Sequence, residues 1–266
     1  MNIVNLTLVN LKINKKQIIG WGVAIFSIMF LYMILFPSVK DMAQIKMESM
    51  PKEIMQFMGV NSFEDMSNYL EYFAMIYNLL LIAISVFAAI FGANIVANEE
   101  KNKTLEFTYA LKVSRLEIYI SKVIATFLGV IFVIIAAAVA TIICGLISGG
   151  ETFDLAKVIM MIKGAGQIPF VYMAIGLMFS AITTKFGGAS ISSMIVILTY
   201  VIGFLSTMVS EGLRWIEWIS PFEMLKPNKV IELNADVMLA MSIYAVFMIV
   251  CIVVGGFSYN KRDFNL

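Results

Sequence analysis

The sequence predicts an all-α membrane protein with six transmembrane helices, and three observations support this fold class. Of the 266 residues, 61% are hydrophobic and 14% are charged, whereas soluble globular proteins carry roughly 45–50% apolar and about 25% charged residues. The hydrophobic residues gather in six long runs that contain no Asp, Glu, Lys or Arg. Such runs indicate helices, because the strands of a membrane barrel alternate apolar and polar residues over about ten positions.

Each run is close to the roughly 20 residues that a helix needs to cross the hydrocarbon layer. The six predicted spans are residues 18–36, 73–97, 123–147, 164–182, 189–208 and 237–257. We expect one transmembrane domain over residues 1–266, because no remaining stretch is long enough to form a separate soluble domain. Pro169, together with Gly164 and Gly166, is expected to kink or unwind the start of the fourth span.

The distribution of cations predicts the orientation of the chain. With six spans, the termini, the segment 98–122 and the turn at Lys185 share one side and carry eleven Lys and Arg residues, against eight on the other side. The acids are distributed in the opposite sense, five against thirteen. Because Lys and Arg are enriched in cytoplasmic loops, both termini are expected in the cytoplasm of a multi-pass protein of the bacterial plasma membrane.

The chain has no histidine, which excludes many enzyme classes. Ser-His and Cys-His nucleophilic sites and His-ligated zinc or haem all lose an essential group. Cys144 and Cys251 lie in apolar runs without CxxC spacing, so they are expected to be buried thiols that pack as small hydrophobic groups. The residues therefore predict no catalytic site and no metal site on this chain.

The absence of ionisable residues from the spans also disfavours a proton-coupled carrier, because proton relays place such residues inside the membrane. The spans contain only mild polar side chains, which commonly form hydrogen bonds between helices. Three of them are candidates for the wall of a translocation path: Asn78, Asn94 and Gln167.

The segment between the second and third spans, residues 98–122, is called the elbow below. Ser114 and Glu117 have the spacing of a capping box, which predicts that a new helix begins at Arg115 and continues into the third span. Upstream, residues 104–111 can form a short separate helix with exposed aromatic and charged side chains for a partner. The alternative is an amphipathic loop that rests on lipid head groups.

The elbow resembles the coupling region of the type-2 exporter permeases of the ATP-binding-cassette superfamily. The resemblance is carried by Glu99-Glu100, by Thr104-Leu-Glu106, by Ala110-Leu-x-Val-Ser-Arg115 and by Lys122 at the start of the third span. The departure is Lys103, where the family has a small residue or glycine before Thr-Leu-Glu. The six spans and cytoplasmic termini match the family layout, which also includes a cytoplasmic coupling helix and an extracellular re-entrant element before the last helix.

The resemblance implies that two permease subunits, as a homodimer or with a close paralogue, pair with separate ATPase subunits that bind ATP and magnesium. The chain has no GxxxxGK[ST] pattern of its own. The residues carried over as contacts with the ATPase subunit are Glu100, Lys103, Thr104, Leu105, Glu106, Phe107, Ala110, Val113, Ser114 and Arg115. Membrane lipids are expected as further partners, and no nucleic-acid partner is expected.

The segment before the last span, residues 211–236, resembles the re-entrant element of the family. Trp215 and Trp218 are three positions apart, with isoleucines beside them, which is typical of an interfacial aromatic anchor. These tryptophans and the following Ser220-Pro221-Phe222 are alternatively candidates for an extracellular gate.

We therefore expect the transmembrane subunit of an ATP-driven exporter, which is not itself an enzyme. A dry, charge-poor path suits an amphipathic or lipophilic cargo: a peptide such as an antimicrobial peptide, a drug or a lipid. The alternatives are an ion or small-solute carrier or channel that works without an ATPase, and a membrane scaffold.

Overall fold

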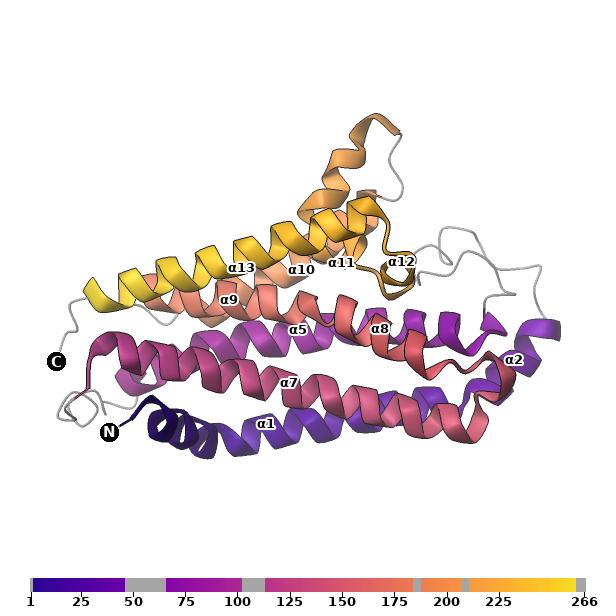
Figure 1. The fold of residues 1–266 in the computed structure, drawn as a ribbon, viewed down its shortest axis with the longest axis horizontal. Helices are drawn as coiled ribbons and strands as arrows, with labels where there is room; N and C mark the ends of the chain where they lie inside the picture. Colours follow the sequence, from indigo (N-terminus) through magenta and orange to yellow (C-terminus); the bar gives the residue numbers. More distant parts are fainter. Residues whose placement is uncertain (1, 46–65, 102–112, 184–187, 207–210, 262–266) are drawn as a thin grey trace.

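The computed structural model describes residues 2–45, 66–101, 113–183, 188–206 and 211–261. Within these ranges the secondary structure is helical and no strand occurs. The long helices run side by side along one direction and form an elongated bundle (Figure 1). The all-α prediction is therefore confirmed.

Six helical segments are long and apolar enough to cross a membrane, as predicted. They are α1 (Ile3–Ile34), α5 (Tyr69–Lys101), α7 (Arg115–Ser148), α8 (Leu155–Ala165) together with α9 (Gln167–Ile182), α10 (Gly188–Ser206) and α13 (Ala235–Lys261). Each predicted span falls mainly within one of these segments.

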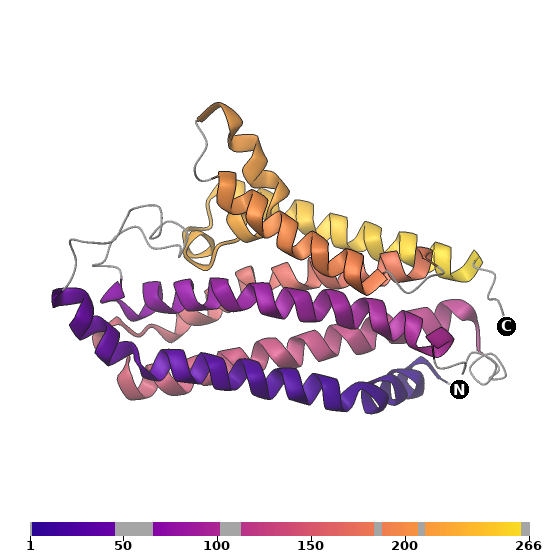
Figure 2. The same ribbon diagram turned by 180° about the vertical axis from the view of Figure 1, so that it is seen from behind.

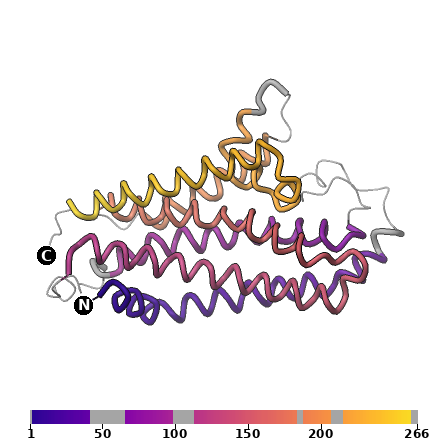
Figure 3. The backbone as a smooth tube through the Cα atoms, viewed as in Figure 1, coloured from indigo at the N-terminus to yellow at the C-terminus, as the bar shows by residue number. Residues whose placement is uncertain are grey.

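The backbone trace shows that α1 begins and α13 ends at the same end of the bundle, which we call the terminal end (Figure 3). The opposite, distal end carries the short elements. These are α2 (Phe36–Ile45), the 3-10 helices η1 (Gly150–Thr152) and η2 (Glu211–Ile219), α11 (Pro221–Met224) and α12 (Pro227–Glu232). η2 projects away from the long helices, and this is visible from both sides of the molecule (Figures 1 and 2).

The core of the bundle is built around α5, which packs closely against α9. Two glycines make this approach possible: Gly176 lies against the carbonyl oxygen of Ala89, and Gly92 lies against that of Met173. Small residues at helix contacts allow two backbones to approach, and in lipid this close packing is a main source of association energy. The central position of α5 agrees with the burial of 67% of its most apolar stretch.

The outer helices have a different character. The corresponding stretches of α1, α10 and α13 are only 28%, 22% and 22% buried, and many of their large apolar side chains are exposed, such as Ile197 and Phe247. An exposed face of this size is unusual for a soluble protein. Its natural neighbours are lipid or a second membrane subunit.

Two element boundaries differ from the prediction. α1 begins at Ile3, well before residue 18, because the cation-bearing turns around Lys12 contain no helix breaker and continue the same helix. The fourth span begins at Leu155, where Asp154 caps the helix by accepting hydrogen bonds from the backbone N–H groups of Ala156 and Lys157. The expected irregularity near Pro169 is present as a break at Gly166, between α8 and α9.

Candidate functional site

The two candidate sites lie at opposite ends of the bundle. α5 ends at Lys101 and α7 begins at Arg115, both at the terminal end (Figure 1). The elbow therefore joins two core helices near the start of α1 and the end of α13. Glu100 lies in the last turn of α5. The other predicted contacts up to Ala110, which are Lys103, Thr104, Leu105, Glu106, Phe107 and Ala110, lie outside the described residues, as does the expected short helix.

The start of α7 confirms the predicted capping box. The backbone N–H of Glu117 donates to Oγ of Ser114 at 3.2 Å, and the backbone N–H of Ser114 donates to Oε2 of Glu117 at 2.7 Å. Two backbone donors that a helix start leaves without partners are thus satisfied reciprocally. The cap makes the junction between the elbow and α7 a defined corner.

Two cations near this corner connect α7 to its neighbours. Arg115 donates from Nη1 to the carbonyl oxygen of Asn260 in α13 at 3.3 Å. Lys122, two turns further on, is completely buried, and its Nζ lies 3.5 Å from the carbonyl oxygen of Val96 in α5. The start of α7 is therefore tied to both α5 and α13.

At the distal end, the five candidates for a gate fall into two groups. Trp215 is 61% exposed, and Trp218 is half-buried, which fits an anchor in the membrane interface. Ser220, Pro221 and Phe222 are buried and belong to the core of the bundle. The segment therefore presents Trp215 outward at one end, packs Trp218 against the bundle and inserts its Ser-Pro-Phe sequence into the protein at the other end.

Phe222 holds the short helix α11 against the long helices. Its ring stacks on Tyr172 of α9 at a centroid distance of 5.4 Å and meets Tyr200 of α10 edge to face at 5.5 Å. Ser220 lies directly against Gly203 of α10, where a side chain would have no space. Any displacement of α11 must therefore break an aromatic cluster shared by two membrane-spanning helices.

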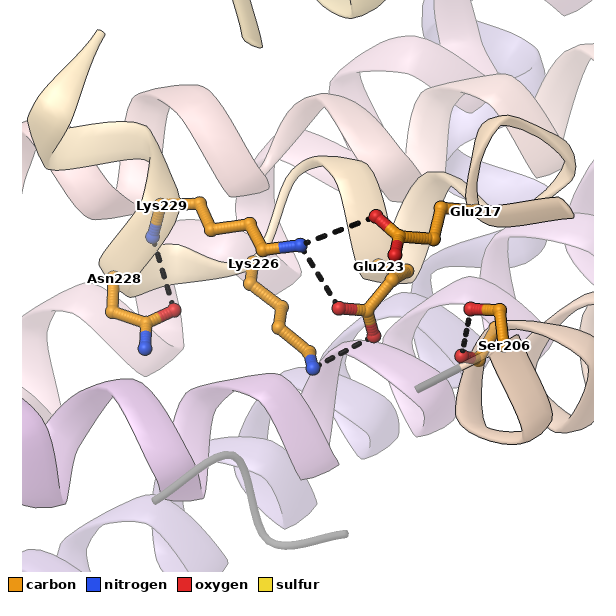
Figure 4. A network of polar contacts seen from close by, with 7 residues as sticks. Ser206, Glu217, Glu223, Lys226, Asn228 and Lys229 are labelled. Carbon is orange, nitrogen blue, oxygen red and sulfur yellow. Dashed lines mark hydrogen bonds and ion pairs between the residues drawn. The ribbon is translucent and has the colours of Figure 1, made fainter. Parts of the chain in front are cut away.

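A cluster of charged side chains covers this inserted segment (Figure 4). The carboxylate of Glu223, a residue that is 5% exposed, receives Lys226 Nζ at 2.7 Å and Lys229 Nζ at 2.9 Å. Glu217 lies 3.9 Å from Lys229 Nζ and links η2 to α12. We call Glu217, Glu223, Lys226 and Lys229 the ionic cluster. Its two acids and two cations balance in charge.

The three candidates for a path wall are placed at different levels. Asn78 and Asn94 are sixteen positions apart on α5, about 24 Å along the helix, so they do not share one site. Gln167 donates from Nε2 to the carbonyl oxygen of Met241 in α13 at 2.9 Å. Its Oε1 and the buried Oδ1 of Asn78 have no hydrogen-bond partner among the described residues.

Sequence reasoning missed Lys122 as a structural link and Glu223 as the centre of an ionic cluster. In the sequence, Lys122 directly precedes a predicted span, and a lysine at such an edge usually has an exposed side chain. The burial of Lys122 is evident only from its contacts in the folded protein. A signal for the ion pairs of Glu223 is present in the sequence, because lysines follow it three and six positions later, at Lys226 and Lys229. Residues three positions apart lie close together on a helix or turn. Cys144 and Cys251 are free and buried, as predicted.

Comparison with known proteins adds one finding. The family model described as "Multidrug efflux system permease Rv1217c, C-terminal domain" matches residues 8–259, which is nearly the whole chain. The match begins within α1, ends within α13 and includes the four membrane-spanning segments between them. No curated protein matches the chain at a significant level.

Proposed function

The chain belongs to the family of the multidrug efflux system permease C-terminal domain, and from this premise we propose that it is the transmembrane subunit of an exporter driven by a separate ATPase. The match over residues 8–259 is the observation that carries the proposal. The six membrane-spanning helices are the architecture that such a subunit requires.

Hydrolysis of ATP is assigned to the partner because the chain has no means of performing it. The sequence contains no GxxxxGK[ST] pattern for binding a nucleotide, and its long helices are the membrane spans themselves. We therefore propose that ATP and magnesium bind to a separate ATP-binding-cassette subunit and that this chain acts as the permease.

The elbow is the proposed docking site for that ATPase, as in the type-2 exporter permeases it resembles. The residues proposed to contact the partner include Phe107 and Arg115. The capped corner at Ser114 and the buried Lys122 support this assignment, because they make α7 a continuous rod tied to α5 and α13. Closure of the ATPase subunits would then move a body of three helices, which is a rigid-body switch between two arrangements.

A second permease subunit, either another copy or a close paralogue, completes the proposed transporter. The support for this is the low burial of α1, whose most apolar stretch is only 28% buried, and the projection of η2 beyond the bundle. A translocation path between two subunits would be walled by apolar faces and mild polar groups. That lining suits a lipophilic or amphipathic cargo, such as a drug, a lipid or an antimicrobial peptide.

The elbow assignment is tested by Phe107→Asp in the purified transporter. We expect the wild-type chain to be isolated from its native host in mild detergent together with an ATPase whose activity rises with cargo. In Phe107→Asp this stimulation is lost while the protein still inserts in the membrane, because a carboxylate replaces the apolar ring at the docking surface. Glu232→Lys, an exposed charge change at the distal end, is the control and should leave stimulation unchanged.

Two outcomes would overturn the proposal at different levels. Unchanged cargo-stimulated ATPase activity in Phe107→Asp would remove the elbow assignment alone. Isolation of the wild-type chain without any ATPase, together with transport by the chain by itself in vesicles, would remove the exporter assignment.

A further inference from the structure

A pocket of about 300 Å³ lies between α9, α10 and α13, next to the segment that follows α10. α10 and α13 both pack on α9 rather than closely on each other, and this leaves a crevice between them. Tyr172 and Ile175 of α9 form its floor, and Ile195 and Thr199 of α10 form one wall.

The opposite wall and the cover come from the segments that follow. Ile243, Tyr244 and Phe247 of α13 form the second wall. Trp218 at the end of η2 and Pro221 of α11 cover the distal side. The pocket thus ends under the tryptophan-bearing segment and lies on the membrane-spanning part of three helices.

The chemistry of the lining specifies an uncharged hydrocarbon ligand. Among the residues that the structure describes, no charged side chain lines the pocket. Its tyrosine hydroxyls are already engaged within the protein: that of Tyr172 bonds to Oγ1 of Thr199, and that of Tyr244 donates to the carbonyl oxygen of Trp218 at 2.9 Å. A polar ligand would have to displace these internal bonds, whereas a hydrocarbon ligand leaves them intact.

The mouth of the pocket opens beside exposed apolar surface on α10 and α13. Ile243 and Phe247 at the mouth are 46% and 44% exposed, and the exposed Ile197 and Leu198 continue the apolar surface on α10. Lipid acyl chains surround such a surface at high concentration. The volume is at the lower limit for a ligand pocket, so it accommodates part of one chain and leaves a head group outside.

We propose that this pocket binds one acyl chain of a membrane phospholipid, which fills the crevice between α10 and α13. The lipid is a resident part of the protein rather than cargo, because the pocket is a lateral recess whose floor, the buried helix α9, closes it toward the core. Its head group lies at the distal end beside η2, at the depth where the tryptophans anchor the segment.

The test uses the full-length protein in detergent and counts retained phospholipid by native mass spectrometry. Ile195→Phe fills the pocket from the α10 wall, and Ile243→Phe narrows it from α13. Ile197→Phe, on the exposed face of α10 and outside the pocket, is the matched control. We expect one phospholipid to remain on the wild-type protein and on the control, and occupancy to fall several-fold in both pocket variants.

A second readout places the lipid beside Trp218. The chain has three tryptophans, so Trp21→Phe combined with Trp215→Phe leaves Trp218 as the only indole. A few equivalents of phosphatidylcholine brominated in one acyl chain should quench its fluorescence, and Ile195→Phe should remove most of this quenching. The proposal is overturned if all variants retain equal lipid, if the bromines do not quench Trp218, or if a lipophilic drug occupies the pocket while phospholipid does not.

Discussion

The ammonium group of Lys122 lies over the aromatic ring of Tyr259, 5.4 Å from the ring centroid, inside the terminal end of the bundle. Both residues are almost fully buried. A cation over an aromatic face is stabilised by the electron-rich ring, more strongly when water is excluded. This contact, together with that of Lys122 to the carbonyl oxygen of Val96, joins α7, α13 and α5 next to the proposed docking site.

The ring of Tyr259 should therefore stabilise the folded protein through Lys122. Tyr259→Leu is expected to lower the melting temperature in detergent by about 2–6 °C, because a cation–π contact contributes about 0.5–2 kcal/mol. Tyr259→Phe keeps the aromatic face and should remain close to wild type. In a Lys122→Met background, Tyr259→Leu should lower the melting temperature by less, because no cation remains to contact the ring. An equal loss in both backgrounds would show that the ring acts by packing alone.

Neutralising one carboxylate of the ionic cluster at the distal end should lower the melting temperature more than the loss of the Tyr259 ring does. Glu223→Gln keeps the shape but removes the charge that both Lys226 and Lys229 contact. Hydrogen bonds to charged groups contribute about 1.5–3 kcal/mol, and a melting temperature lower by about 3–10 °C is expected. Thermal unfolding followed by size-exclusion chromatography measures this shift.

Glu232→Gln is the matched control for Glu223→Gln. Glu232 lies on the same segment, but it is exposed and its carboxylate accepts from Asn234, so its neutralisation should change the melting temperature little. The burial of Glu223 also predicts that the difference persists at high salt, because buried pairs are screened weakly. A difference that disappears in high salt would mean that the cluster is an ordinary surface contact.

The close approach of α5 and α9 gives a third prediction. A methyl group at Gly176 would collide with the backbone carbonyl of Ala89, which cannot move without separating the two helices. Gly176→Ala is expected to destabilise the protein by about 1–3 kcal/mol and to lower its melting temperature by about 3–10 °C. Gly20→Ala, which meets no atom within 4 Å, should leave stability unchanged or slightly higher. Equal effects of the two substitutions would contradict the packing described.

Much of the fold could be predicted because each membrane span is a local property of the sequence. Twenty apolar residues without a charge are sufficient to indicate a helix, and the capping box at Ser114 is set by two residues three positions apart. The burial of Lys122 and the insertion of Phe222 between Tyr172 and Tyr200 were not predictable in this way. Both depend on which helices become neighbours, and the spacing of residues along one chain does not contain that information.

The orientation of the chain gives the last prediction and a condition for the proposed docking. Asn5→Cys at the terminal end and Asn234→Cys at the distal end are matched substitutions at exposed positions, and neither alters the charge balance. The native Cys144 and Cys251 are 0% and 2% exposed, so they should contribute little background labelling. In intact cells a membrane-impermeant maleimide should label Asn234→Cys and should reach Asn5→Cys only after permeabilisation, in accord with the excess of cations on the side of the termini. The opposite pattern would place the elbow outside the cell, where no cytoplasmic ATPase could reach it, and the proposed coupling through α7 would then be physically impossible.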